Sequence, residues 1–136
     1  MKLKGIELKG TYKVEFNGTY FEVYDKNGNR IYYEDSDGKW SKREYDERDN
    51  QTYYEDNYGY WYESEYDKIG NQIYFEDSGG VWVRSEYDER GNQIYYEDSF
   101  GYIVDNRVKE LTIKEIEKLL GYKIKIKGEK KKCIIH

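Results

Sequence analysis

The sequence has few of the residues on which catalytic and metal sites commonly depend. Its single cysteine, Cys133, excludes an intramolecular disulfide framework and a cysteine-based zinc site. Its single histidine, His136, is the last residue, where fraying is expected to make it a poor general base. The sequence contains no Ser/His/Asp set, glycine-rich phosphate loop or nucleotide motif. We therefore expect a non-enzymatic protein with no catalytic residues, no cofactor and no bound metal.

Aliphatic residues are scarce in the middle of the chain, and long apolar runs are absent. Only 37% of the 136 residues are hydrophobic, and 18 tyrosines supply much of that fraction. A core must therefore be built from aromatic rings, which combine a large apolar area with a polar tip. No run reaches membrane-spanning length, and "MKLKGIELKG" lacks the apolar region of a secretory signal. We expect a cytoplasmic protein without membrane association, located in the host cytoplasm if a phage encodes it.

Basic residues are few in the central part of the chain. Residues 31–105 contain 7 Lys/Arg against 20 Asp/Glu, whereas residues 106–136 contain 10 against 4. A segment this acidic repels phosphates, so we do not expect direct nucleic-acid binding by the array. The partner predicted from charge is a basic protein surface. The basic tail fits contact with an acidic partner or nucleic acid, and it also fits a lysine-rich sheet edge that blocks aggregation.

What the sequence has in abundance is one repeated phrase. "GNQIYYEDSFGYI" begins at Gly91, and near-copies begin at Gly28, Asp49 and Gly70. The aromatic doublets recur every 21 residues, as do the Tyr-Asp pairs; the doublets start at Tyr32, Tyr53, Tyr74 and Tyr95, and the pairs at Tyr24, Tyr45, Tyr66 and Tyr87. A fixed period in this range is typical of a repeat protein.

Each repeat is predicted to form one β-hairpin. Two runs rich in aromatic and β-branched residues alternate with Gly/Asn turns, and no helical periodicity competes with this pattern. The turn glycines supply the positive φ that tight turns need; they are Gly28, Gly70 and Gly91 on one side and Gly38, Gly59, Gly80 and Gly101 on the other. The predicted fold is mainly β, an antiparallel meander of 21-residue hairpins after one or two lead-in strands and a degenerate first copy.

Alternation along each strand predicts which side chains share a face of the sheet. The tryptophans share a face with Glu44, Glu65 and Glu86, while Tyr45, Tyr66 and Tyr87 lie on the other face. Adjacent carboxylates of each "ED" pair point to opposite faces. This separation, repeated in every copy, argues against a two-carboxylate glycosidase site.

The pattern changes after Ile103. In "LTIKEIEKLLG", Thr112 and Glu115 form a capping-box pattern and Gly121 ends an amphipathic helix. Tyr122, Ile124 and Ile126 then alternate with lysines, which predicts a short strand. We expect three regions: residues 1–23 with lead-in strands and a degenerate repeat, residues 24–105 with the acidic array, and residues 106–136 with a basic helix-strand cap.

The array resembles the YD (RHS-type) repeats, whose units centre on a Tyr-Asp pair followed by a glycine-containing turn. Tyr45-Asp46, Tyr66-Asp67 and Tyr87-Asp88 match the core pair, and the resemblance covers about residues 24–102. It departs from the family in the added "YYEDS" phrase and in length, because the toxin members build a large shell from many more units. The resemblance implies β-hairpin repeats.

The array also resembles short tyrosine-rich repeat proteins of phage and other mobile elements, and "LTIKEIEKLLGYKIKI" is similar to a small cassette found in them. Together with the acidic charge, this resemblance predicts a phage-encoded anti-defence inhibitor, anti-CRISPR-like, that blocks a basic nucleic-acid-binding groove. The partner would be a nucleic-acid-guided nuclease.

The residues predicted to bind the partner are repeated carboxylates with aromatic anchors, namely Glu34, Asp35, Glu55, Asp56, Tyr60, Trp61, Glu76, Asp77 and Trp82. Two alternatives stay open. The aromatic rows suit carbohydrate or cell-surface binding, and the sheet edges suit a structural assembly that joins protomers into an oligomer. "EDSDG" faintly resembles a calcium loop, but turn chemistry explains it better.

Overall fold

The computed structural model describes residue 8 and residues 11–125. The chain divides into two compact units between Asn106 and Arg107. The first unit contains all of the strands in the described residues, and the second contains the helix.

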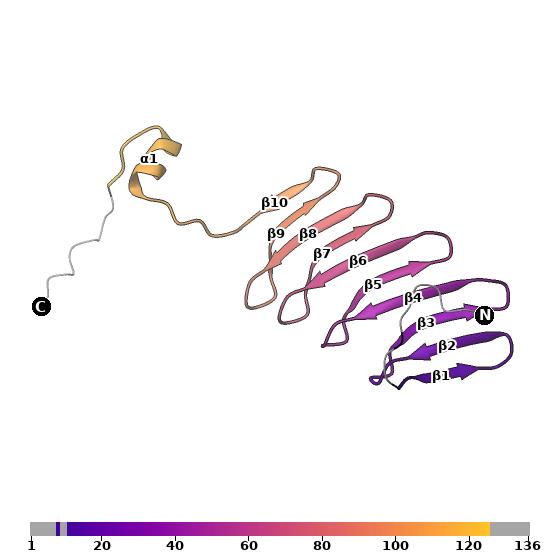
Figure 1. Ribbon diagram of the computed structural model, residues 1–136. Helices are drawn as coiled ribbons and strands as arrows, with labels where there is room; N and C mark the ends of the chain where they lie inside the picture. Colours follow the sequence, from indigo (N-terminus) through magenta and orange to yellow (C-terminus); the bar gives the residue numbers. More distant parts are fainter. Residues whose placement is uncertain (1–7, 9–10, 126–136) are drawn as a thin grey trace, which may run out of the picture. The chain divides into compact units, whose positions relative to one another are not determined.

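The first unit is one open sheet of ten antiparallel strands in which each strand pairs with its neighbours in sequence (Figure 1). This confirms the predicted mainly β meander. Residues 8, 11 and 12 of the lead-in region form no strand. The strands are β1 (Lys13–Phe16), β2 (Tyr20–Tyr24), β3 (Arg30–Asp35), β4 (Trp40–Tyr45), β5 (Gln51–Asp56), β6 (Trp61–Tyr66), β7 (Gln72–Asp77), β8 (Trp82–Tyr87), β9 (Gln93–Asp98) and β10 (Ile103–Asp105).

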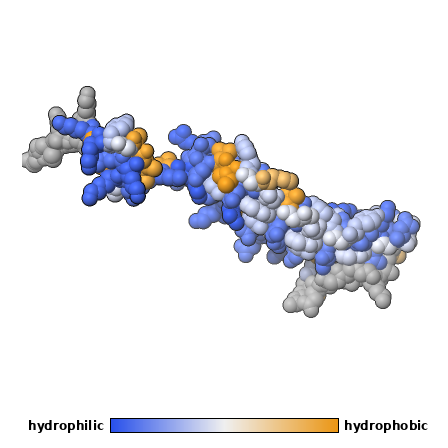
Figure 2. Space-filling model, turned by 90° about the horizontal axis from the view of Figure 1, so that it is seen from above, coloured by the Kyte–Doolittle hydropathy of each residue, from blue (hydrophilic) through white to orange (hydrophobic). Residues whose placement is uncertain are grey.

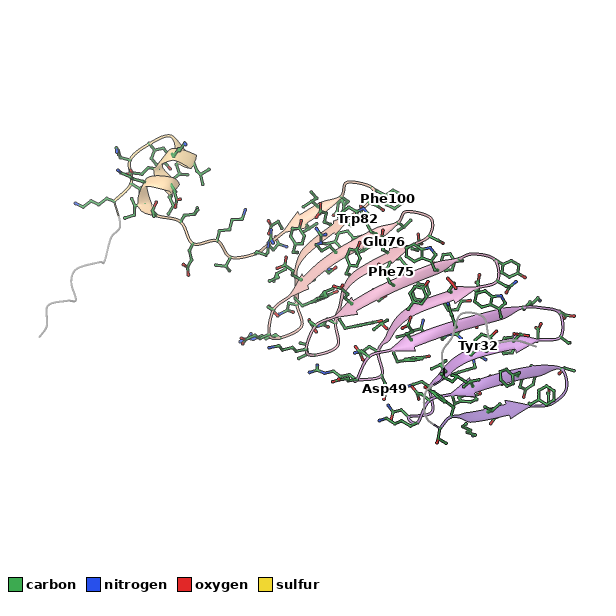
Figure 3. All side chains as sticks on the ribbon, viewed as in Figure 1. Tyr32, Asp49, Phe75, Glu76, Trp82 and Phe100 are labelled. Atoms are coloured by element: carbon green, nitrogen blue, oxygen red, sulfur yellow. The ribbon has the colours of Figure 1, made fainter. Side chains whose placement is uncertain are left out.

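The hairpin turns that follow "YD" and "ED" share one design. Asp88 N–H donates to the Asn92 carbonyl at 2.9 Å, and Gly91 N–H donates to the Asp88 carbonyl at 3.0 Å. This is a three-residue loop that ends in a left-handed residue, and Gly91 has φ 85°. Asp49 takes the glycine position in its turn with φ 64°. Its Oδ1 accepts hydrogen bonds from Asn29 Nδ2 at 2.7 Å and Asn27 Nδ2 at 3.1 Å, which ties adjacent turns together (Figure 3).

Every second hairpin contains a β-bulge that sequence reasoning missed. In the β8–β9 pair, Tyr87 faces Gln93 but Glu86 faces Tyr95, so Ile94 is an extra residue. The equivalent residues are Ile31, Thr52 and Ile73. The bulge explains the odd period. Without the extra residue, positions 21 apart would lie on opposite faces of the sheet.

Within the described residues of the first unit, each strand packs only against its neighbours in the sheet. Val23 and Tyr32 are the only fully buried large side chains among them. The surface seen in Figure 2 is mostly hydrophilic, with small apolar areas. Stabilisation comes instead from side chains that lie across the strands, such as Tyr54 stacked on Tyr62 with ring centroids 5.3 Å apart.

The second unit contains α1 (Ile113–Leu120). Thr112 and Glu115 form the predicted capping box, and Gly121 ends the helix with φ 80°. Tyr122 to Lys125 form no strand, and Ile124 N–H instead donates to Glu117 Oε2 at 3.0 Å. The remainder of the predicted strand, from Ile126 onward, lies outside the described residues, as do Cys133 and His136.

Candidate binding face

The predicted partner-binding residues are distributed over both faces of the sheet. Register places Glu34, Glu55 and Glu76 directly opposite Trp40, Trp61 and Trp82, respectively. We call the face that carries these residues the Trp face. Its opposite, which carries Asp35, Asp56 and Asp77 with the rings of Tyr54, Tyr62 and Phe75, is called the Tyr face. The predicted separation of the two carboxylates in each "ED" pair is confirmed.

The aspartates of the Tyr face hold the turns of their own hairpins. Asp35 Oδ1 accepts hydrogen bonds from the backbone of Asp37 at 2.9 Å and Lys39 at 3.0 Å. Its Oδ2 accepts a hydrogen bond from the Tyr33 hydroxyl at 3.1 Å. Burial favours the neutral acid, but the Lys39 and Asp37 N–H groups outweigh it and hold the pKa of Asp35 below its ordinary value. Asp56 has the equivalent hydrogen bonds, so these carboxylates are occupied within the chain.

Tyr60 also lies with the Tyr face. Its ring centroid is 6.2 Å from that of Tyr54 and 6.1 Å from that of Tyr62. Burial, followed by the negative charge of Asp77, raises the pKa of Tyr60. The side chain is 41% exposed. Tyr60 and Trp61 are therefore neighbours in sequence that present their rings on different sides of the sheet.

The glutamates of the "ED" pairs lie on the Trp face, and each accepts a hydrogen bond from the tyrosine two residues earlier on the same strand. Oε2 of Glu76, which is labelled in Figure 3, accepts a hydrogen bond from the Tyr74 hydroxyl at 3.0 Å. Burial and then the bond to Glu76 raise the pKa of Tyr74. Equivalent bonds join Tyr32 to Glu34, Tyr53 to Glu55 and Tyr95 to Glu97. Glu97, absent from the predicted set, thus belongs to the same ladder.

Strand pairing arranges the Trp face in rows that cross four adjacent strands. The first row is Tyr32, Lys42, Glu55 and Trp61; the second is Tyr53, Glu63, Glu76 and Trp82; the third is Tyr74, Arg84, Glu97 and Ile103. The three rows differ in charge only at their second position, which is occupied by Lys42, Glu63 and Arg84. Lys42 Nζ lies 3.2 Å from Glu55 Oε2, and Arg84 Nη1 lies 3.6 Å from Glu97 Oε2.

The second row has a carboxylate where the other rows have a cation. Glu63 faces Glu76 across β6 and β7, and among the described residues no cation pairs with either. Like charges directly opposite each other destabilise a sheet. Glu63 and Glu65 are both exposed. Neither glutamate was predicted from the sequence as a binding residue, although positions 42, 63 and 84 differ in charge between the repeats.

The tryptophans are half-buried and positioned through their backbones. Trp61 N–H donates to Ser78 Oγ at 3.2 Å, and Ser78 N–H donates to the Trp61 carbonyl at 2.9 Å. Asn57 holds Trp40 in the same way, and Ser99 holds Trp82. This contact joins one hairpin to the next, so the small polar residue after each "ED" does more than form a turn. The result is a regular row of indole rings on one face.

The described residues offer neither a metal cluster nor a membrane-spanning helix. No group of three or more His, Cys, Asp or Glu side chains in that part of the chain is placed to hold a metal ion. No helix among the same residues is long and apolar enough to cross a membrane.

Comparison with known proteins found no family model that matches the chain and no curated protein with significant similarity to it.

Proposed function

We propose that this protein is a non-enzymatic binding protein whose Trp face docks on a basic surface of another protein. One observation carries the proposal: half-buried indole rings alternate with carboxylates across one face of the sheet. Aromatic side chains supply contact area, and carboxylates supply attraction to a basic partner and selection against acidic ones.

The proposed contact set differs from the set predicted from the sequence. Asp35 and Asp56 hold their own turns, and Tyr60 packs on the Tyr face. The residues proposed to meet the partner are Trp61, Trp82, Glu55, Glu63, Glu65 and Glu76. Residues 31–105 contain 20 acidic against 7 basic residues, so the long-range field around the array favours a basic partner.

The class of partner follows from charge and from resemblance. A groove that binds nucleic acid displays basic residues at regular intervals, and the acidic rows of the Trp face offer such a groove a competing ligand. The resemblance of the repeats to short proteins of phage supports a role in phage–host conflict. The proposed activity is therefore inhibition of a bacterial defence nuclease, anti-CRISPR-like, by occupying its nucleic-acid groove.

The test is capture from bacterial lysate by the full chain, at low and at high salt, with the captured proteins identified. A triple variant, Glu63→Lys, Glu65→Lys and Glu76→Lys, reverses the charge of three glutamates on the Trp face. A matched variant, Asp37→Lys, Glu47→Lys and Glu89→Lys, makes the same charge change in the exposed turns.

Support requires that a basic nucleic-acid-binding protein is captured at low salt, that the Trp-face variant loses it, and that the turn variant keeps it. The purified partner must also lose its nucleic acid when the chain is added. The proposal would be contradicted if the amount of captured partner were the same at low and at high salt and with both variants.

One observation favours a second candidate, carbohydrate binding. Trp40, Trp61 and Trp82 recur on every second strand, which spaces the rings about 10 Å apart in a line. A row of flat rings along one face of a sheet suits stacking against an extended glycan chain. Retention on insoluble polysaccharide that survives high salt and is lost on Trp61→Ala would favour this candidate over a charge-driven one.

A further inference from the structure

The repeats of the Trp face show how this surface holds a cation. In the third row, the Arg84 guanidinium carbon lies 5.7 Å from the Trp82 ring centroid and 6.0 Å from that of Tyr74. Its Nη1 is 3.6 Å from Glu97 Oε2. The guanidinium group thus lies within cation–π distance of two aromatic rings and pairs with one carboxylate. In the first row, Lys42 lies between Tyr32 and Glu55 in the register and pairs with Glu55 at 3.2 Å.

The second row provides the same surroundings with the opposite charge at the centre. Tyr53 and Glu76 flank Glu63 across the strands as Tyr74 and Glu97 flank Arg84. Trp61 precedes Glu63 by two residues on β6, as Trp82 precedes Arg84 on β8. Glu63 replaces the cation and adds a second carboxylate opposite Glu76. Glu63 is exposed, whereas Tyr53, Trp61 and Glu76 are half-buried, so the group is open to solvent from the Trp face.

We propose that Tyr53, Trp61, Glu63 and Glu76 form a seat for one arginine side chain of the partner. The inference rests on the proposed function and names the chemistry of its central contact. It relies on more than a cluster of acids, because two equivalent positions of the same sheet already hold a cation against the matching glutamate. Charge complementarity completes the argument, since an incoming cation relieves the repulsion between Glu63 and Glu76.

Arginine fits this seat better than lysine does. Its planar guanidinium stacks on an aromatic ring, donates to carboxylates in two directions and is more weakly hydrated than an ammonium group. The seat is also single. The rows on either side are already neutralised by Lys42 and Arg84, so one arginine per chain is expected.

The direct test titrates acetyl-arginine-amide into the isotope-labelled full chain at low salt and follows the three tryptophan indole N–H signals by NMR. We expect the largest shift at Trp61, a smaller shift at Trp82, which faces Glu76, and none at Trp40, which neighbours Lys42 on its strand. Acetyl-lysine-amide is expected to bind roughly tenfold more weakly, since it lacks the stacked, two-directional contact. Equal shifts at all three indoles, or no shift at Trp61, would overturn the seat.

Two variants sharpen the assignment. Glu63→Arg supplies the cation from the chain itself, so binding of acetyl-arginine-amide at Trp61 should be lost. Glu65→Arg makes the same charge change on the same strand and face but opposite Tyr74, and it should retain most of the binding. Arg84→Glu should create a second seat, with two arginine amides bound per chain and a large shift at Trp82. Identical losses in Glu63→Arg and Glu65→Arg would indicate general attraction and contradict a specific seat.

The same variants separate this inference from the proposed function. If the captured partner is lost with the Trp-face triple variant but kept with Glu63→Arg, the binding face stands and the arginine seat is wrong. If neither variant affects capture, both proposals fail.

Discussion

The hydroxyl of Tyr54 donates a hydrogen bond of 3.0 Å to Oδ2 of Asp56, two residues further along β5. The same bond links Tyr33 to Asp35 and Tyr96 to Asp98, whereas Phe75 stands at the equivalent position of β7 and has no hydroxyl. The bond anchors a strand residue to the carboxylate that shapes the next turn. Burial and this bond raise the pKa of Tyr54.

Removal of that hydroxyl should cost stability without changing the fold. Tyr54→Phe keeps the ring that stacks on Tyr62 and lies under Arg43, and it loses only the bond to Asp56. We expect a loss of about 0.5–1 kcal/mol in the free energy of unfolding, measured with urea. Tyr58→Phe, at a side chain 76% exposed, is the control and should change little. Equal effects of the two changes would show that the Tyr54 bond is not stabilising.

Acid should weaken the turns that follow "YD". Hydrogen bonds from the backbone and side chain of Asn92 hold the pKa of Asp88 below its ordinary value. The pKa of the carboxyl in the unfolded chain is about 3.9, so the stability from Asp88 is present above that pH and is lost as pH falls through the lowered folded pKa. Asp88→Asn should lower the urea midpoint at pH 7 and flatten its fall between about pH 4 and 2. Glu89→Gln, in the exposed part of the same turn, is the control and should leave the urea midpoint at pH 7 unchanged.

The left-handed turn position should discriminate between side chains. Gly91 has φ 85°, and no atom lies within 4 Å of a Cβ added there, so the cost of substitution comes from the backbone alone. Gly91→Ala should lower the free energy of unfolding by about 1–2 kcal/mol. Gly91→Asn should cost less, because asparagine tolerates this conformation. Thermal unfolding of both variants gives the comparison, and an alanine variant as stable as the parent would argue against the left-handed turn.

The repulsion on the Trp face should be measurable in the chain alone. Glu63→Arg replaces a like-charge pair with Glu76 by an opposite-charge pair, so we expect the free energy of unfolding to rise by about 0.5–1 kcal/mol at low salt. The gain should shrink at high salt because the site is exposed. Glu65 faces Tyr74, so Glu65→Arg is the matched control and should raise the free energy of unfolding by less. If the Glu63→Arg chain were less stable than the parent, the interpretation that Glu63 and Glu76 repel each other would be wrong.

The period and the alternation of the sequence were enough to predict the meander, the glycine turns and the two faces. The capping box of Thr112 and Glu115 was predicted from its own local pattern, because it depends on residues close together in sequence. The bulge at Ile94 was not predicted, although an odd repeat period indicates one extra residue in each unit.

The candidate site was less predictable. Asp56 has the charge of a binding residue, but its hydrogen bonds to the turn backbone emerge only from the folded hairpin. The pairing of Glu63 with Glu76 depends on register, which the bulge sets, so alternation alone could not find it.

The bulge also determines how a sheet of this kind can change its length. Gain or loss of one complete 21-residue unit adds or removes two strands and leaves every tryptophan on its original face. A unit one residue shorter would move the side chains of all following strands to the opposite face of the sheet. Extension by whole units therefore preserves both faces of the sheet and lengthens it in steps of about 10 Å. The length of the sheet and the number of rows on its Trp face can therefore change while the chemistry of each row is preserved.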